Sequence, residues 1–169
     1  MSTPSRWLDA LRGRFIVLDG PDGSGKSTQF RQLVERCRGA SVPVTEVREP
    51  GGTRIGEKIR SLLLDPENVE MSVRCEMLLY MASRAQLVEE RIRPALERGE
   101  AVIADRFISS TLAYQGTAGG LAPEEILAVG AVAVGGLQPD LTLIFDVDEQ
   151  TAARRMGLLL DRMAQKGLE

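Results

Sequence analysis

Residues 15–27 of the chain read FIVLDGPDGSGKS. The apolar run Phe15–Leu18 predicts a buried strand, and the letters from Gly20 to Ser27 fit the pattern G-x-x-x-x-G-K-[ST]. A strand, a glycine-rich turn and a helix, in this order, form the context in which the pattern binds phosphate groups. The glycines let backbone N–H groups surround phosphate oxygens at the start of a helix. We therefore predict that the chain binds a nucleoside triphosphate; the bland alternative is an ordinary glycine-rich turn.

Individual residues of this loop have separate expected tasks. The ammonium group of Lys26 is expected to contact the outer phosphates of ATP, and the hydroxyl of Ser27 to bind the accompanying Mg²⁺ ion. Asp22 is unusual beside bound phosphates because like charges repel. The predicted ATP-binding residues are Gly20, Asp22, Gly23, Ser24, Gly25, Lys26, Ser27 and Thr28.

The composition excludes several classes of function. The net charge of −3 argues against general binding of nucleic acids, since such binding needs a basic face. No apolar run approaches the length of a membrane helix, so we expect no membrane as partner. The sequence contains no histidine, which excludes a mechanism that depends on an imidazole base. Phosphoryl transfer tolerates this absence because it depends mainly on positioning and charge stabilisation.

The chain length indicates the number of domains, and the cysteines indicate the cellular compartment. A chain of 169 residues is typical of one domain. We predict this domain at residues 14–169, after an N-terminal extension at residues 1–13. Cys37 and Cys75 lie far apart and match no zinc or redox motif, so we expect both to be reduced in the cytoplasm.

Alternating strands and helices predict an α/β fold with three layers and a central parallel sheet. The expected strands are Phe15–Leu18, Val42–Val47, Ala101–Ala104 and Leu141–Val147. The expected helices run from the phosphate loop to about Arg38, from Arg54 to Leu64, from Val73 to Arg98 with a kink or division at Pro94, and from Pro123 to Val134. Ligands of such sheets bind beyond the carboxyl ends of the strands. The polar residues that follow the strands should therefore converge on one cleft: Asp19-Gly20, Arg48-Glu49, Asp105-Arg106 and Asp146.

Four further segments accompany the phosphate loop in a characteristic order and spacing. They read REPGGT at 48–53, EMLLYMASR at 76–84, DRFISSTLAYQG at 105–116 and LQPDL at 137–141. With these segments the chain resembles the thymidylate kinases over about residues 14–163. The resemblance implies a P-loop kinase fold, transfer of the γ-phosphate of ATP to dTMP in nucleotide biosynthesis, Mg²⁺ as cofactor, a homodimer and a cytoplasmic location.

The same resemblance implies a binding site for dTMP. Tyr80 would stack on the pyrimidine and Arg84 would bind its edge, with Thr111 and Gln115 near the thymine. Tyr114 would pack against the deoxyribose, where a bulky ring disfavours a 2′-hydroxyl. The implied dTMP-binding residues are Asp22, Pro50, Arg60, Tyr80, Arg84, Arg106, Ser110, Thr111, Tyr114 and Gln115. From spacing alone, Tyr80 and Arg84 share one helix face and would also fit a core stripe with a surface cation.

The implied catalytic residues are Lys26, Asp105, Arg106 and Arg155. A carboxylate at Asp105 can orient magnesium-bound water, and the guanidinium of Arg106 can clamp the acceptor phosphate. Ser27 and Asp105 are accordingly the expected metal-binding residues. The alternative for Asp105-Arg106 is a structural salt bridge, and Arg60 could be a solvated arginine.

The expected lid, at about residues 150–165, departs from the family pattern. Thymidylate kinases carry an arginine in the phosphate loop or in the lid, and Gly23 stands at the loop position, so the lid must supply the cation. Arg154, Arg155 and Arg162 remain there, but three leucines occupy 158–160 and Ala164 replaces a common glutamate. The segment would also fit an amphipathic helix with a solvated basic face.

The chain ends at Glu169, whereas thymidylate kinases usually continue, so we expect the last edge strand of the sheet to be absent. Strand Phe15–Leu18 would remain central, and Leu141–Val147 would lie at an edge. Two alternatives to a working dTMP kinase stay open. One is a catalytically weak nucleotide-binding relative, and the other is a kinase for a different deoxynucleoside monophosphate.

Overall fold

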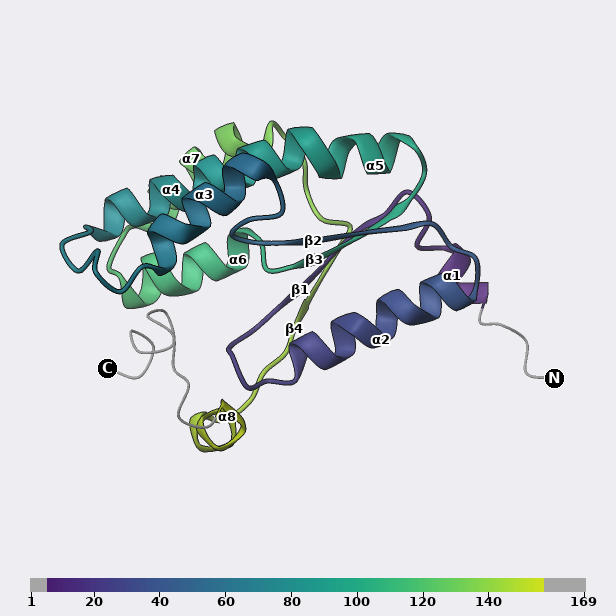
Figure 1. The fold of residues 1–169 in the computed structure, drawn as a ribbon, viewed down its shortest axis with the longest axis horizontal. Coiled ribbons are helices and arrows are strands. Elements are labelled where there is room, and N and C mark those ends of the chain that lie inside the picture. Colours follow the sequence, from purple (N-terminus) through teal and green to yellow (C-terminus); the bar gives the residue numbers. More distant parts are fainter. Residues whose placement is uncertain (1–5, 157–169) are drawn as a thin grey trace.

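The structure is a computed structural model, and it describes residues 6–156. Its centre is a parallel sheet with the strand order β2-β3-β1-β4. The strands are β1 (Phe15–Asp19), β2 (Val44–Arg48), β3 (Ala101–Asp105) and β4 (Leu141–Ile144). Helices cover both faces of the sheet (Figure 1). The predicted α/β fold with a central parallel sheet is therefore confirmed, and β1 is central as expected.

Local sequence signals set the ends of most long helices. These helices are α2 (Lys26–Gly39), α3 (Arg54–Leu64), α4 (Val73–Leu87) and α7 (Pro123–Val134). The side chain of Thr53 accepts a hydrogen bond from the N–H of Gly56 at the start of α3, and Ser72 caps α4 in the same way. Such caps satisfy N–H groups that have no partner inside the helix. The predicted bounds of α3 and α7 are confirmed.

The long helix expected at 73–98 is divided into three parts. After α4 the chain forms the π-helical segment η1 (Val88–Ile92) and then α5 (Arg93–Glu97). Pro94 lies in the first turn of α5. Because proline has no N–H and its ring clashes with the preceding turn, it cannot continue a regular α-helix. The backbone before Pro94 forms the wider π-helical turn of η1 instead. The expected division of the helix near Pro94 is therefore confirmed.

Other elements differ from the sequence-based expectation. The short helix α1 (Arg6–Asp9) was not predicted, whereas α8 (Glu149–Met156) lies where an amphipathic helix was the alternative for the lid. The helix after β3 is divided into α6 (Ile108–Thr111) and the π-helical η2 (Leu112–Ala118). Strand β2 begins at Val44 rather than at residue 42, because Pro43 cannot donate to a sheet. Strand β4 ends at Ile144 rather than at residue 147.

Two hydrophobic clusters lie on opposite faces of the sheet. Phe15 and Val17 point to one face and join a cluster with Leu87 of α4. Ile16 and Leu18 point to the other face and join a cluster with Val34 of α2. This alternation follows the two-residue period of a strand. Figure 1 shows α3, α4, α5 and α7 on one side of the sheet and α1 and α2 on the other, so β1 is buried on both faces.

Strand β4 forms an exposed edge of the sheet. It pairs with β1 on one side, and all four of its residues are exposed within the described part of the chain. The edge position expected for this segment is therefore confirmed. Separately, none of the helices between residues 6 and 156 is long and apolar enough to cross a membrane.

The core predicts a clear contrast between two Val→Ala substitutions. Val102 of β3 is fully buried, whereas Val132 of α7 is 84% exposed. We expect Val102→Ala to lower the free energy of unfolding by about 1.5–3 kcal/mol, because it removes buried methyl groups and leaves a cavity. Val132→Ala should change it by less than about 0.5 kcal/mol. Urea unfolding of both variants measures the difference, and equal effects would contradict the assigned core.

Candidate active site

A cavity of about 220 Å³ opens at the carboxyl ends of β1, β2 and β3. The residues implied to bind dTMP all line it, together with Lys26, Ser27 and Asp105. Its walls come from the phosphate loop, the segment after β2, helices α3 and α4, and the segment after β3. The lining residues are Asp22, Lys26, Ser27, Arg48, Glu49, Pro50, Arg60, Leu64, Tyr80, Arg84, Asp105, Arg106, Phe107, Ser110, Thr111, Tyr114 and Gln115.

The remaining expected site residues lie beside this cavity, in the phosphate loop or in α8. Gly20, Gly23, Ser24 and Gly25 form the loop between β1 and α2, and Thr28 lies in the first turn of α2. Gly25 precedes α2 with a left-handed backbone, at φ 90°. The hydroxyl of Ser24 is buried and has no hydrogen-bond partner in the described part of the chain. A buried group of this kind is available to a ligand.

The register of β1 and β3 brings the phosphate loop to Asp105. Leu18 lies opposite Asp105 in the sheet, and Lys26, which begins α2, forms an ion pair with the carboxylate of Asp105. The side chain of Lys26 is only 5% exposed. A buried ammonium group requires such a partner, and the pair places this lysine at the cavity wall.

Arg106 is fixed at the centre of the site by its backbone and its side chain. Its φ of +72° is uncommon for a residue other than glycine, and its N–H donates to the carbonyl of Leu18 at 2.9 Å. Its guanidinium donates to Asp22 at 2.6 Å and to Ser110 at 3.1 Å, and lies over the ring of Tyr114. The side chain that should clamp a phosphate is thus held in place before any ligand binds.

The electrostatics of Arg106 favour a permanent positive charge. Burial lowers the pKa of its guanidinium, but Tyr114 and the carboxylates of Asp22 and Asp19 more than offset this effect, so the pKa stays above its ordinary value. A charge that is fixed in position and protonation state suits electrostatic stabilisation of a transferring phosphoryl group.

Asp19 was expected near the cleft, but the sequence reasoning assigned it no task. It is 3% exposed, and its carboxylate accepts hydrogen bonds from the hydroxyls of Ser109 and Ser110 and from the N–H of Gly20. It therefore connects the phosphate loop to the segment that carries Arg106. Its place at the end of a buried strand, directly before the loop, predicted its location but not these partners.

Arg84 is buried, at 1% exposure, so the alternative that treated it as a surface cation is wrong. Its Nε donates to Glu49 at 2.7 Å and its Nη2 to the hydroxyl of Thr111 at 3.2 Å. Its guanidinium also lies 5.2 Å from the centre of the Phe107 ring. Burial raises the pKa of Glu49 although Arg84 opposes this shift. The carboxylate of Glu49 and the ring of Phe107 thus hold the arginine at the cavity.

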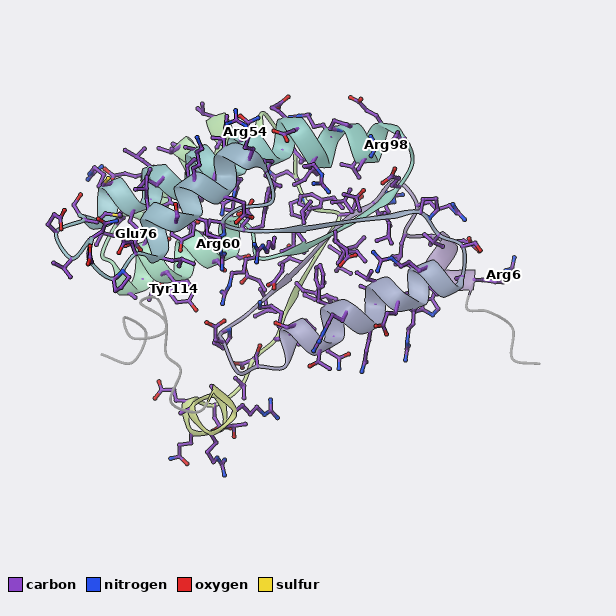
Figure 2. All side chains as sticks on the ribbon, viewed as in Figure 1. Arg6, Arg54, Arg60, Glu76, Arg98 and Tyr114 are labelled. Atoms are coloured by element: carbon purple, nitrogen blue, oxygen red, sulfur yellow. The ribbon has the colours of Figure 1, made fainter. Side chains whose placement is uncertain are left out.

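Gln115 and Arg60 each form a hydrogen bond that holds the side chain at the cavity. The Nε2 of Gln115 donates to Glu76 at 2.8 Å, and both side chains are buried. Nη1 of Arg60 donates to the carbonyl of Pro50 at 2.9 Å. Figure 2 shows Arg60 of α3, Glu76 of α4 and Tyr114 of η2 at the same end of the molecule. Glu76 is a second partner that the sequence reasoning did not assign.

Helix α8 lies against the phosphate loop. Nη1 of Arg155 donates to the carbonyls of Gly23 and Ser24, at 3.2 and 3.4 Å. A Cβ at Gly23 would lie 2.5 Å from the carbonyl oxygen of Ala152, so only glycine allows this approach. The rest of the expected lid, including Arg162 and the leucines at 158–160, lies outside the described residues.

The fold and the cavity together define a P-loop nucleoside monophosphate kinase. A central strand runs into a glycine-rich loop and a helix that begins with a buried lysine, and a second cavity wall carries arginines and an aromatic ring. Comparison with known proteins identifies the family. The thymidylate kinase family profile matches residues 18–164. The chain belongs to the thymidylate kinase family.

Individual relatives agree with this assignment. The thymidylate kinase of an Exiguobacterium species is 49% identical over 146 residues, which cover 86% of this chain and 69% of the relative. That of Deinococcus radiodurans is 51% identical over 148 residues, which cover 85% and 71%. A crystal structure of the thymidylate kinase from Ehrlichia chaffeensis superimposes with a TM-score of 0.73 at 36% identity, covering 84% of this chain and 75% of that chain.

The close approach at Gly23 predicts that this residue cannot be replaced. Gly23→Ala would place a Cβ against the backbone of α8 and force an L-residue into φ +78°. Left-handed strain alone is worth roughly 1–2 kcal/mol, so we expect affinity for a non-hydrolysable ATP analogue to fall by about tenfold or more, measured by calorimetry. Gly39→Ala is the matched control, because a Cβ there meets nothing within 4 Å. Equal affinities of the two variants would contradict the assignment.

Proposed function

We propose that this chain transfers the γ-phosphate of ATP to dTMP, which gives ADP and dTDP. The observation that carries the proposal is the cavity at the strand ends. Cations that can hold phosphates line it, namely Lys26, Arg60 and Arg106, and so do Tyr80, Arg84 and Gln115, which can hold a pyrimidine. Membership of the thymidylate kinase family supports the same reaction.

The proposed acceptor site uses the side chains of α4 and of the segment after β3. Tyr80 is half-buried at the cavity wall, where its ring can stack on the base, while Arg84 and Gln115 bind the base edge. Tyr114 limits the space beside the sugar, which favours a deoxyribose. Asp22, whose Oδ1 accepts from Arg106, has a second oxygen that can accept from the 3′-hydroxyl.

The proposed chemistry needs positioning rather than a strong base. The attacking group is a phosphate oxygen, which is already anionic near neutral pH. Lys26 and the loop N–H groups hold the donor phosphates, and Arg60 and Arg106 hold the acceptor phosphate in line with them. Arg155, which contacts the phosphate loop from α8, is the proposed lid cation.

Mg²⁺ is the proposed cofactor, and the residues present fit it. The hydroxyl of Ser27 and the carboxylate of Asp105 both line the cavity, and hard oxygen donors are the ligands that Mg²⁺ prefers. No group of three or more acidic, histidine or cysteine side chains able to hold a metal occurs between residues 6 and 156. This agrees with an ion held by one or two protein oxygens and the nucleotide phosphates. When bound, the ion would neutralise charge on the β- and γ-phosphates.

Three further properties are proposed from the family relationship. They are a homodimer, a cytoplasmic location and a domain that begins at residue 14. The segment before residue 14 contributes the buried side chain of Leu8 to the core on the α2 face. The proposed boundary at residue 14 thus marks where the family resemblance begins, and not where the hydrophobic core begins.

An acceptor panel tests the proposed function. The 169-residue chain is assayed for ADP release from ATP and Mg²⁺ with dTMP, dUMP, dCMP or dGMP as acceptor. We expect dTMP to give the highest kcat/KM. Nucleotide binding without ADP release would indicate the catalytically weak relative, and rates dominated by dGMP or dCMP would refute the assigned acceptor.

The clamp at the centre of the site predicts the effect of removing Arg106. Arg106→Ala should lower kcat/KM for dTMP at least about tenfold, because the fixed charge stabilises the transferring group. A tenfold loss corresponds to about 1.4 kcal/mol of transition-state stabilisation. Arg98→Ala serves as the control, because Arg98 lies in an exposed ion pair with Glu100, at the far side of the molecule from Arg60 and Tyr114 (Figure 2). Near-normal rates for Arg106→Ala would remove this residue from the clamp.

A further inference from the structure

A buried carboxylate to which the proposed chemistry gives no task contacts a side chain that lines the cavity. Glu76 of α4 is 1% exposed, and it accepts a hydrogen bond of 2.8 Å from Nε2 of Gln115 on η2. Gln115 is itself only 2% exposed and lines the cavity. Burying a carboxylate is unfavourable unless its partners compensate, so its position against a cavity-lining amide calls for a function.

A glutamine amide has two different ends, and its partner decides which end faces the ligand. The NH₂ group donates and the carbonyl oxygen accepts, whereas a carboxylate only accepts. With Nε2 held by Glu76, the carbonyl oxygen Oε1 is the end left for the cavity. We propose that Glu76 is a positioning residue that fixes the amide of Gln115 with its acceptor towards the base, and thereby sets the choice of base. This inference rests on the proposed acceptor site.

The neighbouring base contact has a fixed polarity as well. Arg84 carries only donors; its Nε and Nη2 are held by Glu49 and by the hydroxyl of Thr111, and its Nη1 donates to Sδ of Met81 at 3.0 Å. The second N–H of Nη1 is the donor left to Arg84, which lines the cavity, so the cavity presents one donor from Arg84 and an acceptor from Gln115. The edge of thymine or uracil has the complementary order, with O4 as acceptor and N3–H as donor. Cytosine has the reverse order, with an amino group at C4 and an unprotonated N3.

Complementary hydrogen bonding of this kind discriminates strongly between bases when the hydrogen-bonding groups are buried. A cytosine would bring its amino group to the remaining N–H donor of Arg84 and its N3 to the oxygen of Gln115, which leaves both pairs unsatisfied. A site built around a hydrogen bond rejects analogues that cannot form it by large factors. If the amide of Gln115 could turn over freely, its NH₂ group would face N3 of cytosine and half of this discrimination would be lost.

The first test uses the unmodified chain and the pair dUMP and dCMP. These nucleotides have the same sugar, phosphate and shape, and differ only at positions 3 and 4 of the base. We expect calorimetry to give at least about 30-fold tighter binding of dUMP, the range of discrimination by one or more buried hydrogen bonds. Affinities within about threefold of each other would overturn the proposed polarity. Since binding is measured without turnover, this result is independent of whether the chain is an active kinase.

The second test is Glu76→Gln, which keeps the shape of the side chain but can both donate to and accept from Gln115. We expect the affinity for dCMP to rise and that for dUMP to change by less than about twofold, so that their ratio falls roughly tenfold. Mere loosening of the site would weaken the binding of both nucleotides. Loss of the buried charge would change both affinities equally, because the two nucleotides carry the same phosphate. Glu124→Gln, at an exposed position in the first turn of α7, is the matched control and should leave the ratio unchanged.

The double variant Glu76→Gln with Gln115→Glu exchanges the two groups and should restore the ratio. The new amide at 76 then donates to the new carboxylate at 115, whose other oxygen accepts from N3–H. A folded Glu76→Gln variant with an unaltered ratio would overturn the role of Glu76. Should that variant fail to fold, the comparison of dUMP with dCMP on the unmodified chain still decides whether the cavity has the proposed polarity. Failure of the kinase assay alone would count against the proposed function, not against this inference.

Discussion

The parallel pairing of β1 with β3 is the constraint on which the site depends. It places Leu18 opposite Asp105, and the N–H of Arg106 continues the ladder by donating to the carbonyl of Leu18. The phosphate loop after β1 and the Asp105-Arg106 pair after β3 must therefore emerge side by side. This geometry joins Lys26 to Asp105 and Arg106 to Asp22. Because both strands are buried on both faces, the arrangement is held by the core and not by the ligand.

Three of the cations at the cavity have carboxylates as partners. Lys26 pairs with Asp105, Arg106 with Asp22, and Arg84 with Glu49. The carboxylates lower the cost of burying these charges, and they fix the side chains before the ligand arrives. Less conformational freedom is then lost on binding. A phosphate bound at the proposed site would compete with the carboxylates of Asp22 and Asp105, and without it these ion pairs keep the cations in place.

The sequence predicted the elements whose signals are local. The bounds of α3 and α7 follow from a capping threonine, a proline at a first turn and a terminal glycine, and the motif residues led to the cavity walls. The partners of those residues were not predicted, because they are distant in the chain. Arg84 and Glu49 are separated by 35 positions, and Gln115 and Glu76 by 39. A carboxylate in a helix has no sequence mark that says which side chain it faces; only packing of α4 against η2 and against the segment after β2 decides it.

The carboxylates around the cavity therefore divide by the kind of group they hold. Those that face lysine or arginine balance a charge, and any rotation of the cation still presents donors to the ligand. An amide is different, because turning it over exchanges donor for acceptor without changing its shape. Such a side chain specifies a base only when a second group fixes its orientation. Glu76 is placed to do this for Gln115. In the proposed site, phosphate binding and base choice then depend on separate carboxylates, so one property can be changed by substitution while the other is retained.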